Sequence, residues 1–117
     1  MTEFVTTLII PRETESIGTH AFSRCESLVH LALHEGLKRI GPMAFMKCIG
    51  LTSITIPHSV TKIGFYAFEG CSSLANVVMP NDSIKIGKGV FFNCPSLSEE
   101  SKEYLKEKHP QALADAL

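Results

Sequence analysis

The chain has 117 residues, of which 44% are hydrophobic, and its 11 basic and 12 acidic side chains leave a formal net charge of −1. A length of this order suits one domain that buries a core of its own. The charge balance argues against a nucleic-acid binder, because such proteins need a basic surface that displaces counterions from phosphates.

Targeting segments are not apparent in the sequence. No apolar run approaches the ~20 residues that cross a bilayer, so no membrane insertion is predicted. The first residues lack the basic region and long apolar stretch of a signal peptide. On this evidence the chain as it stands is expected to be cytoplasmic.

The sequence repeats with a period of 23 residues, which predicts four units at 5–27, 28–50, 51–73 and 74–96. Each unit opens with apolar residues at its first, fourth and sixth positions, and the last two alternate with an outward residue as in a short strand. Proline is predicted to end the strand, because it lacks the donor that a ladder uses. His34 replaces this proline in the second unit, where a longer strand is predicted.

After a turn, each unit returns through a second apolar pair, for example Val60 and Ile63, and then reaches a glycine such as Gly64. This glycine is predicted to need either a positive φ or the close approach of two backbones. The next segment, Ala67-Phe68-x-x-Cys71 in the third unit, is predicted to form one helical turn that faces inward.

The predicted core is shared between units, because one coil is too thin to bury its own apolar side chains and at least three must stack. One structural column is expected to consist of Phe22, Phe45, Phe68 and Phe91. Stacked cysteines would lie ~5 Å apart, within reach of a disulfide. Side chains of one column point the same way, however, and zinc-type spacing is lacking. Buried free thiols are therefore favoured over disulfides between neighbours and over a metal site for Cys25, Cys48, Cys71 and Cys94.

These motifs are similar to a known family. Leu-x-x-Ile-x-Ile-Pro followed by Val-x-x-Ile-Gly-x-x-Ala-Phe-x-x-Cys resembles the BspA-like leucine-rich repeat family across residues 5–96. The resemblance implies an α/β repeat solenoid: a right-handed leucine-rich-repeat coil with a short parallel β-sheet on its concave side. It also implies a cell-surface or secreted location, and adhesion to matrix proteins or other cells for some members.

Residues 97–117 are predicted to form a helical C-terminal cap that covers the fourth unit. Ser96 and Glu99 suit a capping box at its start, and Pro110 is expected to break the helix before a second short turn. At the other end, only residues 1–4 precede the first predicted strand. Exposed edges invite pairing, so we expect either further repeats in a longer parent or a homo-oligomer formed through the N-terminal edge.

The sequence predicts no catalytic residue, cofactor or metal site, because it contains no nucleophile elbow, P-loop or dinucleotide fingerprint. Two histidines four apart on one strand would stand ~13 Å apart, too far for one ion. What remains is the outward face of the predicted strands, which forms two columns of mostly small residues. This candidate protein-binding face comprises Thr7, Ile9, His30, Ala32, His34, Ser53, Thr55, Asn76 and Val78.

Function is therefore predicted to be non-catalytic, adhesion-type binding of a protein partner through this face, without nucleic acid. The face lacks the Trp, Tyr and Arg residues that usually carry interface energy, so a solvated face that binds nothing is the competing interpretation. Two alternatives stay open: a structural or spacer segment of a longer surface protein, and a module that self-associates through its N-terminal end.

Overall fold

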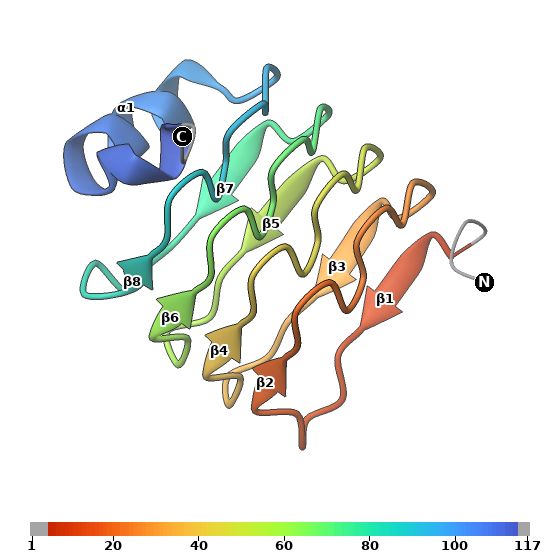
Figure 1. Cartoon of the computed structure of the whole chain (residues 1–117). Helices are drawn as coiled ribbons and strands as arrows, with labels where there is room; N and C mark the ends of the chain where they lie inside the picture. The colour runs from red at the N-terminus through yellow and green to blue at the C-terminus, as the bar shows by residue number, and fades with distance from the viewer. Residues whose placement is uncertain (1–4, 115–117) are drawn as a thin grey trace.

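The computed structural model describes residues 5–114 as a stack of coils with parallel strands (Figure 1). Each coil contributes two strands. The first strands are β1 (Thr7–Ile9), β3 (His30–Ala32), β5 (Ser53–Thr55) and β7 (Asn76–Val78). The second strands are β2 (Ser16–Ile17), β4 (Arg39–Ile40), β6 (Lys62–Ile63) and β8 (Lys85–Ile86). Paired residues are 23 apart, as in Thr7 with His30, which confirms the predicted repeat solenoid with parallel sheets.

The second strands, not the first, form the continuous sheet. Their order is β2-β4-β6-β8, whereas the first strands divide into separate pairs, β1-β3 and β5-β7. The single sheet predicted on the first strands is thus interrupted between the second and third coils. His34 does not lengthen β3, which ends at Ala32, so that prediction was wrong. The imidazole instead folds against the turn, where a Cβ added at Gly36 would lie 3.2 Å from its Nδ1.

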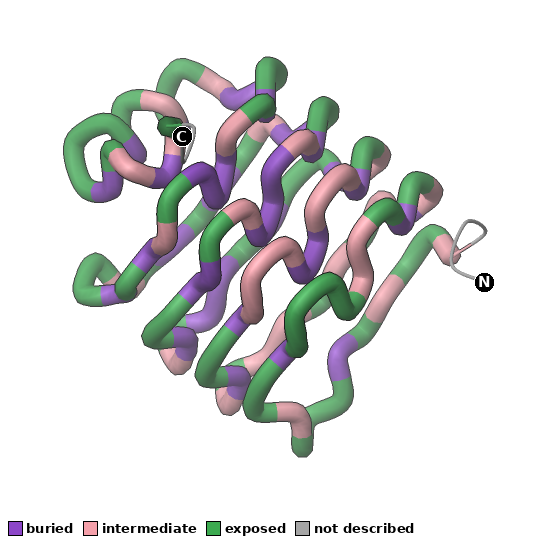
Figure 2. The backbone as a smooth tube through the Cα atoms, in the orientation of Figure 1, coloured by how far each residue is buried: buried purple, intermediate pink, exposed green. Residues whose placement is uncertain are grey.

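A column of four stacked phenylalanines runs through the core, as predicted. Ring centroids are separated by 5.5 Å, 5.2 Å and 5.7 Å along Phe22, Phe45, Phe68 and Phe91, with interplanar angles of 16°, 8° and 14°. The last three rings are fully buried, but Phe22 in the first coil is only half-buried. Figure 2 shows the same gradient along the stack. Each coil is therefore dry only where a neighbour covers it on both sides.

The glycines that follow the second strands do not supply a positive φ, and from the second coil onward they permit close approach to the backbone of the preceding coil. A Cβ on Gly64 would lie 2.5 Å from the backbone nitrogen of Pro42, and one on Gly41 would lie 2.7 Å from the carbonyl oxygen of Ile17. Positive φ occurs two residues later instead, at 57° in Met43 and 59° in Tyr66.

The predicted helical turn around Phe68 is absent, because these left-handed residues break helical geometry. Consecutive turns replace it. The Cys71 N–H donates to the Phe68 carbonyl within the coil, whereas the Phe68 N–H donates to the Val90 carbonyl of the next coil at 2.9 Å. The bodies of the coils are therefore built from strands and turns, and the α-helix of residues 5–114 lies in the cap.

The C-terminal cap consists of α1 (Glu99–Lys108) and a 3-10 helix, η1 (Pro110–Leu113). The N-cap is Ser98, whose Oγ accepts from the Ser101 N–H at 3.1 Å, and not Ser96 as predicted. The Ser96 hydroxyl donates instead to the Ser72 carbonyl of the preceding coil at 2.7 Å. Two parts of the chain lie outside the described residues: the N-terminal segment 1–4 and the end of the predicted cap, residues 115–117.

Both parts of the cap satisfy backbone groups of the last coil. The Val77 N–H of β7 donates to the Ser101 Oγ in α1 at 3.2 Å. The Phe91 N–H donates to the Ala112 carbonyl in η1 at 2.8 Å. Leu105 of α1 and Ala112 of η1 are fully buried. A coil without a following coil thus finds its missing hydrogen-bond partners in the cap.

Candidate functional site

The predicted face on the first strands is exposed but divided. Within β1-β3, Thr7 pairs with His30 and Ile9 with Ala32. Within β5-β7, Ser53 pairs with Asn76 and Thr55 with Val78. All eight side chains are exposed, and Ile9 and Val78, the largest apolar ones, lie at opposite ends of the stack. The structure therefore brings together two groups of four residues and not one platform.

His34, the ninth residue predicted for this face, does not belong to it. It lies beyond β3 and is half-buried, and both its ring nitrogens are inaccessible and have no hydrogen-bond partner among the described residues. Between the two groups, a hollow of about 280 Å³ separates β3 from β5, lined by residues that include Leu33, Ser53 and Thr55. The predicted face on the first strands therefore offers little area that is both continuous and concave.

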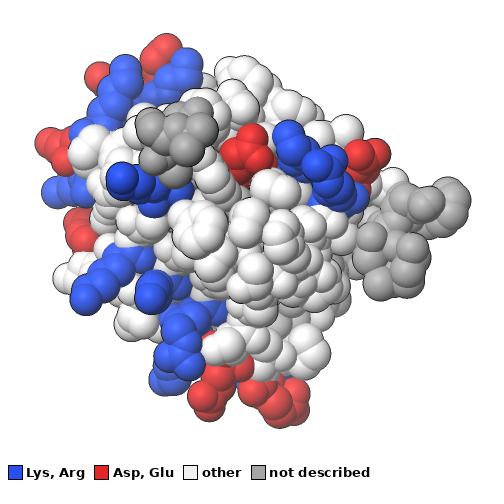
Figure 3. Space-filling view, viewed as in Figure 1, with Lys and Arg blue, Asp and Glu red and all other residues white. Residues whose placement is uncertain are grey.

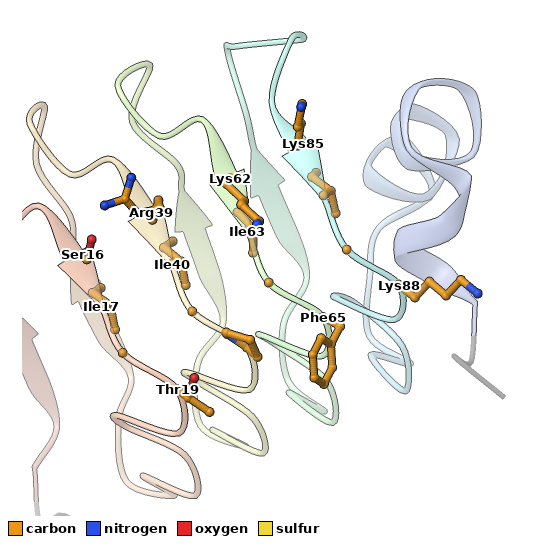
Figure 4. A pocket seen from close by; sticks show the side chains of 16 residues that line it. Ser16, Ile17, Thr19, Arg39, Ile40, Lys62, Ile63, Phe65, Lys85 and Lys88 are labelled. Carbon is orange, nitrogen blue, oxygen red and sulfur yellow. The ribbon is translucent and has the colours of Figure 1, made fainter.

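The four-stranded sheet carries a larger concavity, which we call the basic groove. Its volume is about 860 Å³, and its lining comes from β2, β4, β6 and β8 together with the two residues that follow each strand. Figure 4 shows the labelled side chains along these four strands. In each strand an exposed residue precedes a buried isoleucine, as Lys62 precedes Ile63. Sheet alternation thus points the first residue of every strand outward.

The outward column of this sheet is positively charged. Register places Arg39 beside Lys62 and Lys62 beside Lys85, and all three are exposed. Lys88 follows β8 in the groove lining. Figure 3 shows Lys and Arg side chains gathered where β4, β6 and β8 lie. Adjacent strands are ~4.8 Å apart, so the cations are close neighbours.

This charge is not compensated by salt bridges within residues 5–114. The ion pairs there join Lys47 to Glu69, His58 to Glu35 and Lys102 to Glu99, and none includes a cation of the groove. Like charges directly opposite each other destabilise a sheet. The column therefore costs folding free energy in a chain whose overall charge is only −1.

An exposed aromatic ring borders the cations. Phe65 follows β6 and remains 45% exposed, with its ring edge-on to Tyr66 at a centroid distance of 6.0 Å. Pro42 occupies the equivalent position in the preceding coil, and the glycines between strand and ring leave bare backbone in the floor. The groove thus combines positive charge with an apolar contact surface.

Sequence reasoning missed this groove although a signal for it exists. Ser16, Arg39, Lys62 and Lys85 recur at the twelfth position of successive repeats. The second strands are only two residues long, however, so their periodicity is too short to identify a sheet. That these strands form the unbroken sheet is visible only in the register between coils.

The cysteines have a structural role. All four are buried and free. The thiols of Cys48, Cys71 and Cys94 each donate to a phenylalanine carbonyl of the preceding coil at 3.3 Å. Burial raises the pKa of Cys48 and of Cys94 to about 12 and also raises the pKa of Cys71. Because the thiolate is the nucleophile, these side chains are poorly suited to catalysis.

Two other features bear on the kind of site. Within residues 5–114, no three His, Cys, Asp or Glu side chains are grouped so that they could hold a metal ion. No helix in that part of the chain is long and apolar enough to cross a membrane. Among the surfaces of the described residues, the basic groove has the most distinctive chemistry, because it combines positive charge with an exposed aromatic ring.

The coils, the parallel sheets and the terminal helix together define a leucine-rich-repeat solenoid. Residues 2–104 match a family model described as BspA type leucine rich repeat region (6 copies). The chain belongs to this family, whose repeats are generally non-catalytic.

Solved structures include similar solenoids. A leucine-rich repeat protein from Bacteroides ovatus superposes with a TM-score of 0.77 at 28% identity, covering 96% of this chain and 30% of that protein. A leucine rich cell surface protein from Faecalibacterium prausnitzii is 26% identical, with a TM-score of 0.49 over 80% of this chain and 38% of that one. The chain thus spans less than a third of the Bacteroides ovatus protein. No curated protein matches the sequence.

Proposed function

We propose that this chain is a non-catalytic protein-binding module and that its partner binds along the basic groove. The observation that carries the proposal is the uncompensated column of Arg39, Lys62 and Lys85 on the four-stranded sheet. An adhesion role at the cell surface is part of the proposal and rests on the family to which the chain belongs.

The chemistry of the two surfaces favours the groove. Arginine and aromatic residues contribute disproportionately to binding energy, whereas serine, threonine and valine contribute little. The groove supplies Arg39 and Phe65 in a concave setting. The face on the first strands supplies Thr7, Ser53 and Thr55 on an interrupted surface. A partner therefore gains more contact energy per residue in the groove.

A peptide selection tests the proposal. A phage-displayed library of random dodecapeptides is panned on the immobilised chain, and the selected peptides are measured against two double variants. Arg39→Glu with Lys62→Glu alters the groove in β4 and β6. His30→Glu with Ser53→Glu places two glutamates on β3 and β5 of the same coils. Circular dichroism and urea unfolding verify that both variants are folded.

The expected result is that selected peptides lose at least about tenfold in affinity, or ~1.4 kcal/mol, for the groove variant and less than twofold for the other. The opposite pattern would move the site to the first strands, as the sequence alone suggested. Failure to select any peptide would contradict a protein-binding function and favour the spacer alternative.

A further inference from the structure

We propose, on the basis of the function proposed above, that the basic groove binds an extended acidic segment of a protein. Its carboxylates pair with the column of Arg39, Lys62 and Lys85, and an apolar side chain of the same segment packs on Phe65. The partner is thus defined by its chemistry: alternating or consecutive Asp and Glu residues with at least one large apolar residue.

Charge complementarity is the first argument. The three cations are in register on adjacent strands, are exposed, and are outside every ion pair found within residues 5–114. The sheet bears their mutual repulsion without an acidic strand beside them. A carboxylate placed over the column removes this repulsion and also adds charge-assisted hydrogen bonds.

The dimensions of the groove suit a short extended segment. Three strand-to-strand steps from β2 to β8 cover ~14 Å, and an extended chain advances ~3.3 Å per residue. A segment of four to five residues therefore spans the groove. The Lys and Arg side chains are long and flexible enough to follow the alternating carboxylates.

Phe65 gives the segment a fixed point. Its ring is held edge-on against Tyr66, yet 45% of its surface is exposed beside Lys62 and Lys88 in the same groove lining. An aromatic ring in this position can bury an apolar side chain of the ligand. Mixed acidic and apolar composition distinguishes such a segment from a simple polyanion.

Nucleic acid fits these observations less well. Its affinity comes from many phosphates neutralised in succession, whereas this column ends at Ser16, next to the exposed Glu15 and close to Glu13 in sequence. Figure 3 shows Asp and Glu side chains adjoining the basic residues at that edge. A long polyanion would meet repulsion there, but a segment of a few residues would not.

The experiment uses three fluorescein-labelled probes. The first is a heptapeptide with a central phenylalanine flanked on each side by three glutamates. The second replaces every glutamate by glutamine, and the third is a twelve-nucleotide single-stranded thymidine oligomer. Fluorescence anisotropy measures binding to the whole chain and to the variants Lys62→Gln and Lys106→Gln. Lys106 is an exposed cation in α1, outside the groove, so its variant matches the change in net charge.

The acidic peptide is expected to bind at least about tenfold more tightly than the neutral one. Its affinity should fall as ionic strength rises from about 50 mM to about 500 mM, because salt screens exposed charges. Lys62→Gln should weaken binding severalfold, whereas Lys106→Gln should leave it within twofold. Equal binding of the two peptides, or equal effects of the two variants, would overturn the proposal. Tighter binding of the oligonucleotide would identify the groove as a nucleic-acid site instead.

A stability measurement separates binding from folding. Because Lys62 lies between two cations, Lys62→Gln should leave the urea midpoint unchanged or raise it slightly, and a marked fall would give the column a structural role that overturns the proposal. The peptide selection and the heptapeptide experiment together distinguish failure of the acidic-segment proposal from failure of the proposed function on which it rests. If library peptides need the groove but the neutral heptapeptide binds as well as the acidic one, only the acidic partner is wrong. If no library peptide needs the groove, both fail.

Discussion

The two sets of strands come from the same coils and repeat with the same period, yet they produce different surfaces. The first strands are three residues long, carry small outward side chains and divide into two pairs. The second strands are two residues long, carry a cation in β4, β6 and β8, and form one sheet of four. The groove is proposed as the binding surface on other grounds than strand length and β-propensity. The proposal rests on continuity between coils and on the chemistry of the outward column.

Packing at the glycines that follow β4, β6 and β8 explains why the sheet β2-β4-β6-β8 is continuous. A Cβ added at Gly41, Gly64 or Gly87 would lie within 3 Å of backbone atoms in the preceding coil. This close approach fixes the separation of neighbouring coils on that side. On the other side, the second coil has Leu33-His34 where the third has Ile56-Pro57, and no strand pairing joins β3 to β5 in the described chain.

The largest effect is expected from the core that both surfaces share. Phe68→Ala removes a fully buried ring stacked between Phe45 and Phe91, and should cost about 3–5 kcal/mol of unfolding free energy. Urea unfolding measures this loss, and hydrogen exchange should show both sets of strands losing protection together. Phe22→Ala, at a half-buried ring of the same column, should cost less. Loss of protection in one set of strands only would show that the two surfaces are energetically independent.

An intermediate effect is expected from a change confined to the second sheet. Gly64→Ala places a Cβ 2.5 Å from a backbone nitrogen, so the coils must shift, at a cost of about 1–3 kcal/mol. Gly18→Ala is the matched control, because no atom lies within 4 Å of its added Cβ, and a change within about 0.5 kcal/mol is expected. Equal urea midpoints for the two variants would mean that close approach does not hold this sheet together.

The smallest effect concerns the cap, which touches both sets of strands. His109 is buried beside Tyr104, and its pKa is lowered chiefly by burial, with Lys108 adding to the shift and Asp82 opposing it. The folded state therefore favours the neutral imidazole. Stability from this group should be complete above the unfolded pKa of about 6.5 and should decline as the pH falls below it.

Urea midpoints between about pH 7.5 and 5.5 measure this decline. His109→Gln should flatten the profile in that window. A wild-type profile that is flat, or that rises toward acid, would contradict the sign of the shift. Hydrogen exchange at low pH shows whether the backbone amides of β7 and β8 lose protection together when the cap detaches.

Much of the architecture could be predicted from the 23-residue period. When identical spacings recur, residues of one type must stack in columns, and the phenylalanine column and the cysteine ladder follow directly. The period also located the point at which the repeats end and a cap is needed. The sequence predicts Ser96 and not Ser98 as the N-cap, because both serines precede acidic residues and only packing on the previous coil distinguishes them.

The sequence by itself determined which side chains share a column and which of them face inward, because both follow from translation by one repeat. Only the tertiary structure decided which strands pair across every coil, where φ is positive and that His34 turns away from the surface. These depend on the distance and tilt between neighbouring coils. That geometry results from backbone contacts summed over the whole stack, and no single repeat encodes it.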